Sequence, residues 1–270
     1  MAHEPAIRLA ATLVVFAAVA AGELVAPRRP LRVPKLRRWL HNIAIWIVGS
    51  LTVRFAFPLL AVGMALLAEQ HGFGLLRWFG TDTWLAVPLA VMALDFAIYA
   101  QHVAFHHVPV LWRLHRMHHA DNDIDVTTGT RFHPLEYVLS MLIKLAAVAL
   151  LGAPAVAVLI FEVALNATSM FNHGNLRLPA GVDRLVRTVL VTPDMHRVHH
   201  SVIGAETNSN FGFNLPWWDW IFDTYRAQPQ AGHDGMTIGL PDYQAATRQN
   251  LWWLLLVPFR SPASTRQDQA

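Results

Sequence analysis

Long apolar stretches are the feature of this sequence that most constrains its fold. Residues 7–26 form one run of about 20 residues, enough to cross a hydrocarbon core about 30 Å thick. Residues 39–69, 84–100 and 138–172 form three more. Lipid offers no hydrogen bonds to the backbone, so runs of this kind cross a membrane as helices. The sequence therefore predicts an all-α fold, a multi-span integral membrane helical protein.

The composition agrees with an apolar environment and narrows the chemistry. Of the 270 residues, 54% are hydrophobic and only 14% are charged, whereas soluble domains carry about 25% charge. This balance excludes a disordered chain. There is no cysteine, so disulfides, thiolate nucleophiles and Cys-ligated zinc or iron–sulfur clusters are excluded. The chain has 15 histidines, and any metal chemistry must use imidazole and carboxylate groups.

The apolar stretches differ in what they predict. Residues 7–26 favour a retained span over a cleaved signal peptide, because the run is long and a basic segment follows it. Residues 39–69 indicate one span that is tilted or kinked at Pro58. Residues 138–172 are broken at positions 152–154, which favours two helices in a hairpin that enters and leaves one face. Residues 251–259 are too short to cross and are expected to lie at the membrane interface.

A basic segment sets the expected orientation. Residues 28–38 contain six Lys or Arg and no acid. Such a segment could bind nucleic acid, but beside apolar spans it indicates the cytoplasmic side of the membrane instead. The histidine-rich segments 101–133 and 173–200 then also face the cytoplasm and form a metal-binding helical cap. We expect a multi-pass location, in a bacterial inner membrane, and no nucleic-acid partner.

The histidines fall into patterns that suit metal binding. The clusters are His102 and His106; His115, His118 and His119; and His196, His199 and His200. Residues three or four apart share a helix face, whereas consecutive residues diverge by about 100°. A His-His pair therefore suits two adjacent metals better than one. Imidazole ligands accept zinc, iron, copper or nickel, and eight to ten nitrogens match two ions rather than one.

Other histidines and several carboxylates lie near these clusters. His133 and His173 are predicted as additional ligands. His107 is off the face shared by His102 and His106 and is left out, as are His3, His41, His71 and His233. The carboxylates of Asp95, Glu136, Asp194 and Asp219 are expected to orient ligating imidazoles, although each could equally cap a helix or pair with an arginine.

The motifs around the histidines resemble the fatty acid hydroxylase superfamily, which includes sterol desaturases. The resemblance rests on PVLWRLHRMHH at 109–119, DVTT at 125–128, RFHPLE at 131–136, NHGN at 172–175, TPDMHRVHH at 192–200, NFGFN at 210–214 and WWD at 217–219. It covers residues from about 85 to 226. The chain is accordingly divided into an N-terminal transmembrane region (1–84), a domain similar to this superfamily (85–226) and a C-terminal tail (227–270).

The resemblance implies a non-haem di-iron oxygenase embedded in the membrane. The superfamily's histidine boxes carry over to His102 and His106, to His115, His118 and His119, and to His196, His199 and His200. Its lone middle histidine carries over to His173, and a further ligand to His133. The cofactor is then two iron ions, although the ligands alone would also accept zinc.

The expected function is an O₂-dependent hydroxylase or desaturase of a lipid C–H bond, in an acyl chain or a sterol-like molecule. A metal-dependent membrane hydrolase is an alternative, but the chain lacks the His-Glu-x-x-His motif. A histidine-lined metal transporter or store is another, but it would need ligands in successive spans. A combined assay of metal content and O₂ uptake with lipid separates the three.

The electrons for such a reaction must come from elsewhere. The sequence has no Gly-rich dinucleotide fingerprint and no motif of a fused haem domain, which implies a separate donor such as a ferredoxin, a cytochrome or a reductase. A basic face made of Arg113, Arg116, Arg131 and Arg197 is expected to attract an acidic carrier.

Overall fold

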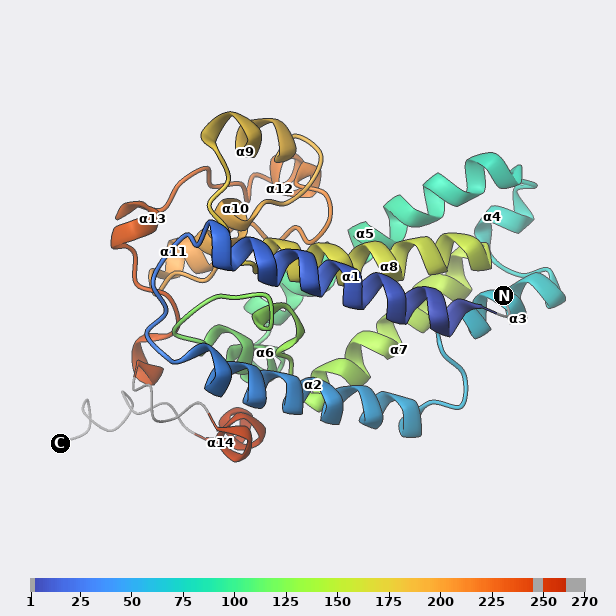
Figure 1. The fold of residues 1–270 in the computed structure, drawn as a ribbon. Helices are drawn as coiled ribbons and strands as arrows, with labels where there is room; N and C mark the ends of the chain where they lie inside the picture. Colours follow the sequence, from blue (N-terminus) through green and yellow to red (C-terminus); the bar gives the residue numbers. More distant parts are fainter. Residues whose placement is uncertain (1–2, 245–249, 261–270) are drawn as a thin grey trace.

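The computed structural model describes residues 3–244 and 250–260 and shows long helices side by side, with a cap of short helices and loops at one end (Figure 1). The long helices are α1 (Glu4–Val25), α2 (Lys35–Ala56), α5 (Thr83–His107), α7 (Pro134–Leu151) and α8 (Ala155–Asn172). The shorter ones are α3 (Ala61–His71), α4 (Leu75–Trp78), α6 (Pro109–His119), η1 (Thr128–Thr130), α9 (Ala180–Val186), α10 (Pro193–His199), α11 (Gly204–Thr207), α12 (Trp217–Ile221), α13 (Gly232–Gly235), η2 (Pro241–Tyr243), α14 (Leu251–Leu256) and η4 (Val257–Phe259).

Within the described residues, five helical segments are long and apolar enough to cross a membrane. They are α1, the stretch Lys35–Trp78 that runs from α2 to α4, α5, α7 and α8. Strands are absent from the same residues, apart from two isolated bridges. The predicted fold class, an all-α protein with several membrane spans, is confirmed.

Proline and glycine residues divide the apolar stretches. The stretch 39–69 separates into α2 and α3 around Pro58, which lies between them, because proline cannot donate the hydrogen bond that continues a helix. The stretch 138–172 forms α7 and α8, as the break in the sequence predicted. Helix α7 ends at Gly152, whose φ of 62° is left-handed, a conformation that costs glycine little.

The loops at the end opposite the cap are in backbone contact. A Cβ atom on Gly74 would lie 2.2 Å from the backbone nitrogen of Gly152, and one on Gly152 would lie 2.5 Å from the carbonyl oxygen of Phe73. Only glycine fits at both positions. This contact joins the segment after α3 to the turn between α7 and α8.

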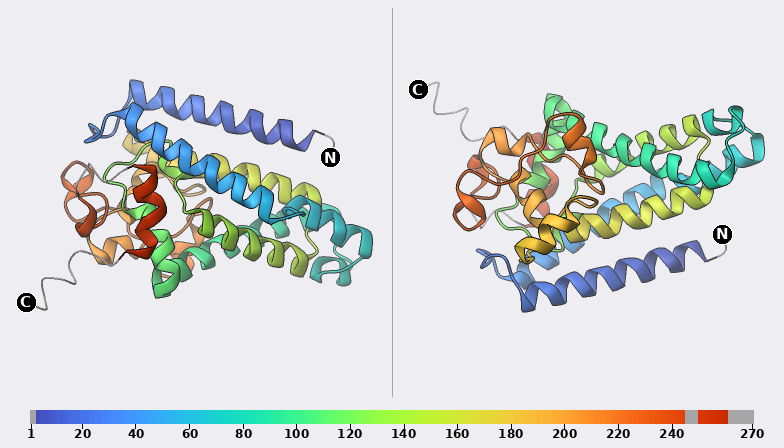
Figure 2. Two further views of the ribbon diagram at one scale, coloured as in Figure 1. Left: turned by 90° about the horizontal axis from the view of Figure 1, so that it is seen from below. Right: turned by 90° about the horizontal axis from the view of Figure 1, so that it is seen from above.

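Several helices and one loop bring the chain into the cap. Helices α5 and α8 end there, α7 begins there, and the loop between α1 and α2 lies at the same end (Figures 1 and 2). The basic segment 28–38 and both histidine-rich segments are therefore at one end of the molecule.

The packing fits a bundle surrounded by lipid. Inside, small residues such as Ala61, Ala65, Ala90 and Ala157 are fully buried, which lets helix backbones approach closely. Outside, large apolar side chains are exposed, including Phe55 at 85%. In water such exposure is unfavourable, whereas lipid solvates it.

A buried ion network ties the cap to α2. Arg38 donates to Asp125 Oδ2 over 2.8 Å and to Asp121 Oδ2 over 2.9 Å, and all three side chains are buried. At the C-terminal side, α14 packs against α2, and η4 packs against α6. Of the predicted tail, residues 245–249 and 261–270 lie outside the described residues.

Candidate metal centre

Nine of the ten predicted histidine ligands come together in the cap. The first histidine group contains His102, His106, His115, His119 and His199, and the second histidine group contains His118, His173, His196 and His200. Within each group, one ring nitrogen per residue lies within 4.8 Å of those of the other members. Eight of the nine are buried, and His106 is partly buried.

Helix geometry explains why there are two groups. Helix α6 carries His118 and His119 at its end, and each points to a different group. His199 and His200, at the end of α10, divide in the same way. The two groups are neighbours, because the rings of His119 and His200 stack with centroids 4.6 Å apart.

The two short helices that carry these histidines, α6 and α10, have N-termini that favour helix formation. Helix α6 begins with Pro109, which favours a first helical turn. Helix α10 begins with Pro193, and the hydroxyl of Thr192 accepts a hydrogen bond from the backbone nitrogen of Met195 over 3.3 Å. This N-cap stabilises a helix of only seven residues.

Oxygen acceptors set the orientation of six of the rings. The Nδ1 atoms of these six histidines contact Phe211 O (from His102, 2.7 Å), Asn208 Oδ1 (His106, 3.2 Å), Glu136 Oε1 (His115, 2.6 Å), Arg131 O (His118, 3.1 Å), Ser169 O (His173, 2.7 Å) and Ser209 O (His199, 2.7 Å). Since carbonyl and carboxylate oxygens only accept, we assign the proton to Nδ1. The Nε2 lone pair of each ring is then available to a metal.

The surroundings and spacing of the Nε2 atoms also fit metal binding. The Nε2 atoms of His102, His115 and His199 are buried and have no hydrogen-bond partner among the described residues, which is costly unless something else binds them. The Nε2 atoms of His173 and His196 are 3.0 Å apart. Two nitrogens that bind one ion at right angles, each about 2.1 Å away, would lie about 3.0 Å apart.

Burial lowers the pKa of all four imidazoles of the second histidine group and keeps them neutral. Burial, together with nearby His200 and His173, holds the pKa of His118 well below its ordinary value. Burial also lowers the pKa of His173 to about 4. Neutral imidazole is the form that binds metal, so the second histidine group is ready for a cation at neutral pH.

The four predicted carboxylates have different roles. Glu136 accepts a hydrogen bond from His115 Nδ1. Asp219 acts indirectly, because it accepts from the backbone nitrogens of Phe211 and Gly212 and so holds the loop whose carbonyl orients His102.

Two carboxylates do not contact a ligand imidazole, contrary to our expectation. Asp95 accepts from Trp218 Nε1 over 2.8 Å and thereby attaches α12 to α5. Asp194 forms ion pairs with Arg28 and Arg197. The arginine pairs of Asp194 match one alternative that the sequence left open, whereas the contact between Asp95 and Trp218 matches none.

His133 lies outside both histidine groups. Its Nδ1 accepts a hydrogen bond from the backbone nitrogen of Leu135 and caps α7, and its Nε2 contacts the carbonyl oxygen of Leu255 over 3.2 Å. Both ring nitrogens are therefore used within the protein. His107 also lies outside the groups, with Nδ1 on the carbonyl oxygen of Val103, and so do His3, His41, His71 and His233.

The prediction of a basic face is wrong, because three of its four arginines are buried. Arg116, Arg131 and Arg197 are all at most 5% exposed, and of the four arginines only Arg113 is exposed. Arg197 pairs with Asp194 and donates to the carbonyl oxygen of Gly174, while Arg116 donates to the carbonyl oxygen of Val257. These guanidinium groups cross-link the cap.

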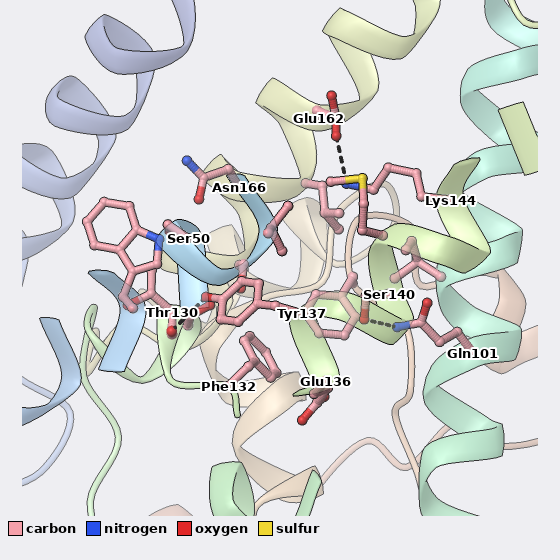
Figure 3. A pocket seen from close by; sticks show the side chains of 18 of the residues that line it. Ser50, Gln101, Thr130, Phe132, Glu136, Tyr137, Ser140, Lys144, Glu162 and Asn166 are labelled. Carbon is pink, nitrogen blue, oxygen red and sulfur yellow. Dashed lines mark hydrogen bonds and ion pairs between the residues drawn. The ribbon is translucent and has the colours of Figure 1, made fainter. Parts of the chain in front are cut away.

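A cavity of about 410 Å³ adjoins the first histidine group. It lies between α1, α2, α5, α7 and α8, and its wall includes His102, His115 and Glu136. Figure 3 shows Glu136 and Phe132 at one side of it, with Tyr137 and Ser140 following along α7. The metal-binding end of the cap is thus continuous with a space among the membrane helices.

Comparison with known proteins supports what this geometry indicates. Residues 87–224, about half of the chain, match the profile of the fatty acid hydroxylase family, and this range contains all nine grouped histidines. The chain belongs to the fatty acid hydroxylase family. No solved structure matches it.

Three relatives illustrate the range of the family. Ornithine lipid hydroxylase OlsE of Rhizobium tropici is 30% identical over 155 residues, which are 56% of this chain and 46% of that protein. Human alkylglycerol monooxygenase is 28% identical over 204 residues (73% and 43%). Delta(7)-sterol 5(6)-desaturase erg3B of Aspergillus fumigatus is 29% identical over 219 residues (75% and 58%). The chain spans about half the length of these relatives.

Some site residues escaped the sequence analysis. The carbonyl oxygens that orient the rings have no signature, because every residue carries one. Three charged residues in the apolar stretches, Arg8, Lys144 and Glu162, also line the cavity. Their signal was available: an ionisable residue within a membrane span is costly and usually functional.

Proposed function

We propose that this member of the fatty acid hydroxylase family is an O₂-dependent di-iron lipid oxygenase, which hydroxylates or desaturates a C–H bond of an acyl chain or a sterol-like lipid. The observation that carries the proposal is the pair of adjacent histidine groups beside a cavity among membrane helices.

The first histidine group would hold one iron with five nitrogens, and the second would hold the other with four. When bound, two irons supply the reduction of O₂ and the oxidation of an unactivated C–H bond. His102 and His115 line the cavity, so the target carbon is placed next to the first group. Glu136 holds the Nδ1 proton of His115 and keeps its Nε2 directed at the site.

Aromatic side chains close the space around the reacting carbon. Phe105, Phe132 and Phe213 line the cavity; Phe132 stacks on His118 with centroids 4.5 Å apart, and Phe213 lies 5.1 Å from the ring of His102. They exclude water from the site, which favours oxidation of the lipid over side reactions.

The alternatives have less support. The named activities of the three relatives are hydroxylation, monooxygenation and desaturation, which favours an oxidoreductase over a hydrolase. A metal transporter would need ligands along the bundle, whereas the two groups lie together in the cap.

Orientation and electron supply complete the proposal. The six basic residues at 28–38 lie at the cap end. The positive-inside rule supports our proposal that the histidines face the cytoplasm and that the membrane is a bacterial inner membrane. The electrons come from a separate ferredoxin, cytochrome or reductase.

The test is lipid oxidation by purified protein in vesicles of host lipid, with a reductant system and ¹⁸O₂. The expected result is an O₂-dependent product that carries one ¹⁸O, or one that has lost two hydrogens. His119→Ala should give none, and His107→Ala serves as the control. A metal-loaded protein that releases lipid hydrolysis products without O₂ would contradict the proposal.

A further inference from the structure

Three charged side chains meet inside the membrane bundle. Lys144 Nζ on α7 lies 2.7 Å from Glu162 Oε1 on α8, and Arg8 Nη2 on α1 lies 2.5 Å from Glu162 Oε2. Figure 3 shows Lys144 and Glu162 joined across the cavity wall. Ionisable groups within spans are rare because hydrocarbon solvates them poorly, and they commonly mark a ligand site. We call these three residues the charged trio.

The charged trio belongs to the same cavity as the first histidine group. Glu136 and Lys144 are eight residues apart on α7, which corresponds to about 12 Å along the helix axis. Between them, the wall carries the hydrogen bond from Gln101 Nε2 to Ser140 Oγ, 2.8 Å long. The cavity therefore has a metal end at Glu136 and a polar end at Lys144.

The charges at the polar end favour an oxygen-rich ligand. Two cations face one carboxylate of the cavity wall. Lys144 carries three N–H donors and uses one on Glu162. Arg8 carries five and uses Nε on Glu4 and one hydrogen of Nη2 on Glu162. Both cations thus keep donors for an acceptor group, while the wall as a whole is balanced, with Arg8 and Lys144 against Glu136 and Glu162.

The two N-terminal helices also border the cavity. Helix α1 packs on α8, and α2 packs on α7, and both α1 and α2 contribute to the cavity wall through residues such as Thr12 and Trp46. The polar end therefore lies among the membrane helices.

We propose that the charged trio binds the oxygen-rich polar group of a single-chain lipid, a carboxylate or an ester carbonyl, while the hydrocarbon chain extends along the cavity toward His102 and His115. The placement of the reacting carbon rests on the proposed function. Binding of the polar group does not. Lys144 and Arg8 donate to the ligand oxygens, and Glu162 positions both cations and weakens their attraction for a second anion.

The test is displacement of a photoactivatable fatty acid from full-length, metal-loaded protein in detergent micelles, read out by mass spectrometry of the labelled peptides. The competitors are palmitic acid, its glycerol monoester and hexadecylamine. Label is expected on peptides of α7 and α8. The acid should compete at least tenfold better than the amine, and competition by the ester as well would assign the carbonyl as the group recognised.

Variants distinguish binding of the lipid from an ion-pair network that only stabilises the packing of the helices. Lys144→Met should weaken the binding of palmitic acid about tenfold or more, because a charge-assisted hydrogen bond is lost. Lys144→Arg should restore this binding. Glu162→Gln should strengthen the binding of palmitic acid, since it leaves both cations without the carboxylate of Glu162. Lys35→Met is the matched control: it breaks the other lysine–glutamate pair, Lys35 Nζ to Glu23 Oε2 at 2.8 Å, outside the cavity.

Two results would overturn this proposal. One is equal competition by acid and amine. The other is that Lys144→Met and Glu162→Gln both lower thermal stability but leave the binding of the acid unchanged. The charged trio would then only stabilise the packing of the helices. A protein that binds the acid as expected but oxidises no lipid would count against the proposed function and not against this site.

Discussion

Replacement of Glu136 by leucine removes one carboxylate from the metal centre and little else. Glu136 is 4% exposed, and its Oε1 lies 2.6 Å from Nδ1 of His115. Without this acceptor the Nδ1 proton is buried and unpaired, and the ring loses the contact that keeps Nε2 directed at the first histidine group. The second histidine group contains neither residue.

The size of the effect follows from the type of bond. Loss of a group that orients a metal ligand costs about 10–100-fold in metal affinity, or about 1.4–2.8 kcal/mol at 1.4 kcal/mol per tenfold. Glu136→Gln keeps an acceptor but not its charge. A neutral hydrogen bond contributes about 1 kcal/mol and a charged one about 1.5–3 kcal/mol, so glutamine should cost about tenfold and leucine more.

The assay is competition with a chelator, followed by metal analysis of the purified protein. Wild type should retain both ions at chelator concentrations where Glu136→Leu retains one. Asp183→Asn is the control, because Asp183 on α9 pairs with Arg187, the residue that follows this helix, and belongs to neither histidine group. If Glu136→Leu and the control release metal at the same chelator concentration, this account of Glu136 is refuted.

Four further predictions concern the ligands, the N-cap of α7, acidity and topology. Alanine at His118, His119, His199 or His200 should abolish lipid oxidation per inserted protein, whereas alanine at His41, His71, His107 or His233 should leave it near normal; equal losses in both sets would mean that the histidines serve stability alone. His133→Ala should keep both metals and lose about 1 kcal/mol of stability, the usual value of an N-cap, as measured by metal analysis and denaturant unfolding; loss of a metal ion would restore it as a ligand. Metal-free protein should lose stability as the pH falls below 6.5: burial lowers the pKa of His173 from 6.5 to about 4, so the unfolded state takes up the proton first, and about 3 kcal/mol from this residue is lost by pH 4. Unfolding in denaturant at pH 7.5 and pH 5 checks this, and a flat profile would contradict it. A tag near residue 34 should be accessible only from the cytoplasm and one near residue 74 only from the other side; the reverse labelling would reject the orientation.

The sequence predicted what depends on helix periodicity and length. Apolar runs specified the spans because a helix must have a certain length to cross a membrane. The spacing of His115, His118 and His119 indicated two sites because adjacent helical residues diverge by about 100°. In the structure these three residues do divide between two groups.

The sequence could not predict what depends on contacts between distant segments. His133 lies in a motif like those of the ligands, yet its ring meets the carbonyl oxygen of Leu255, 122 residues away. Arg131 and Arg197 lie beside ligands and suggested a basic surface, but the fold buries both against acids. Local patterns report which residue types are present, and tertiary packing decides which of them face the site.

We propose that this chain holds two irons in two neighbouring histidine groups. The most direct measurement is the iron content of protein purified without oxygen, compared with its lipid-oxidising activity across preparations of different metal loading. We expect full activity to coincide with about two irons per chain, and preparations with about one iron to be inactive. Full activity with one iron per chain, or with none, would contradict it.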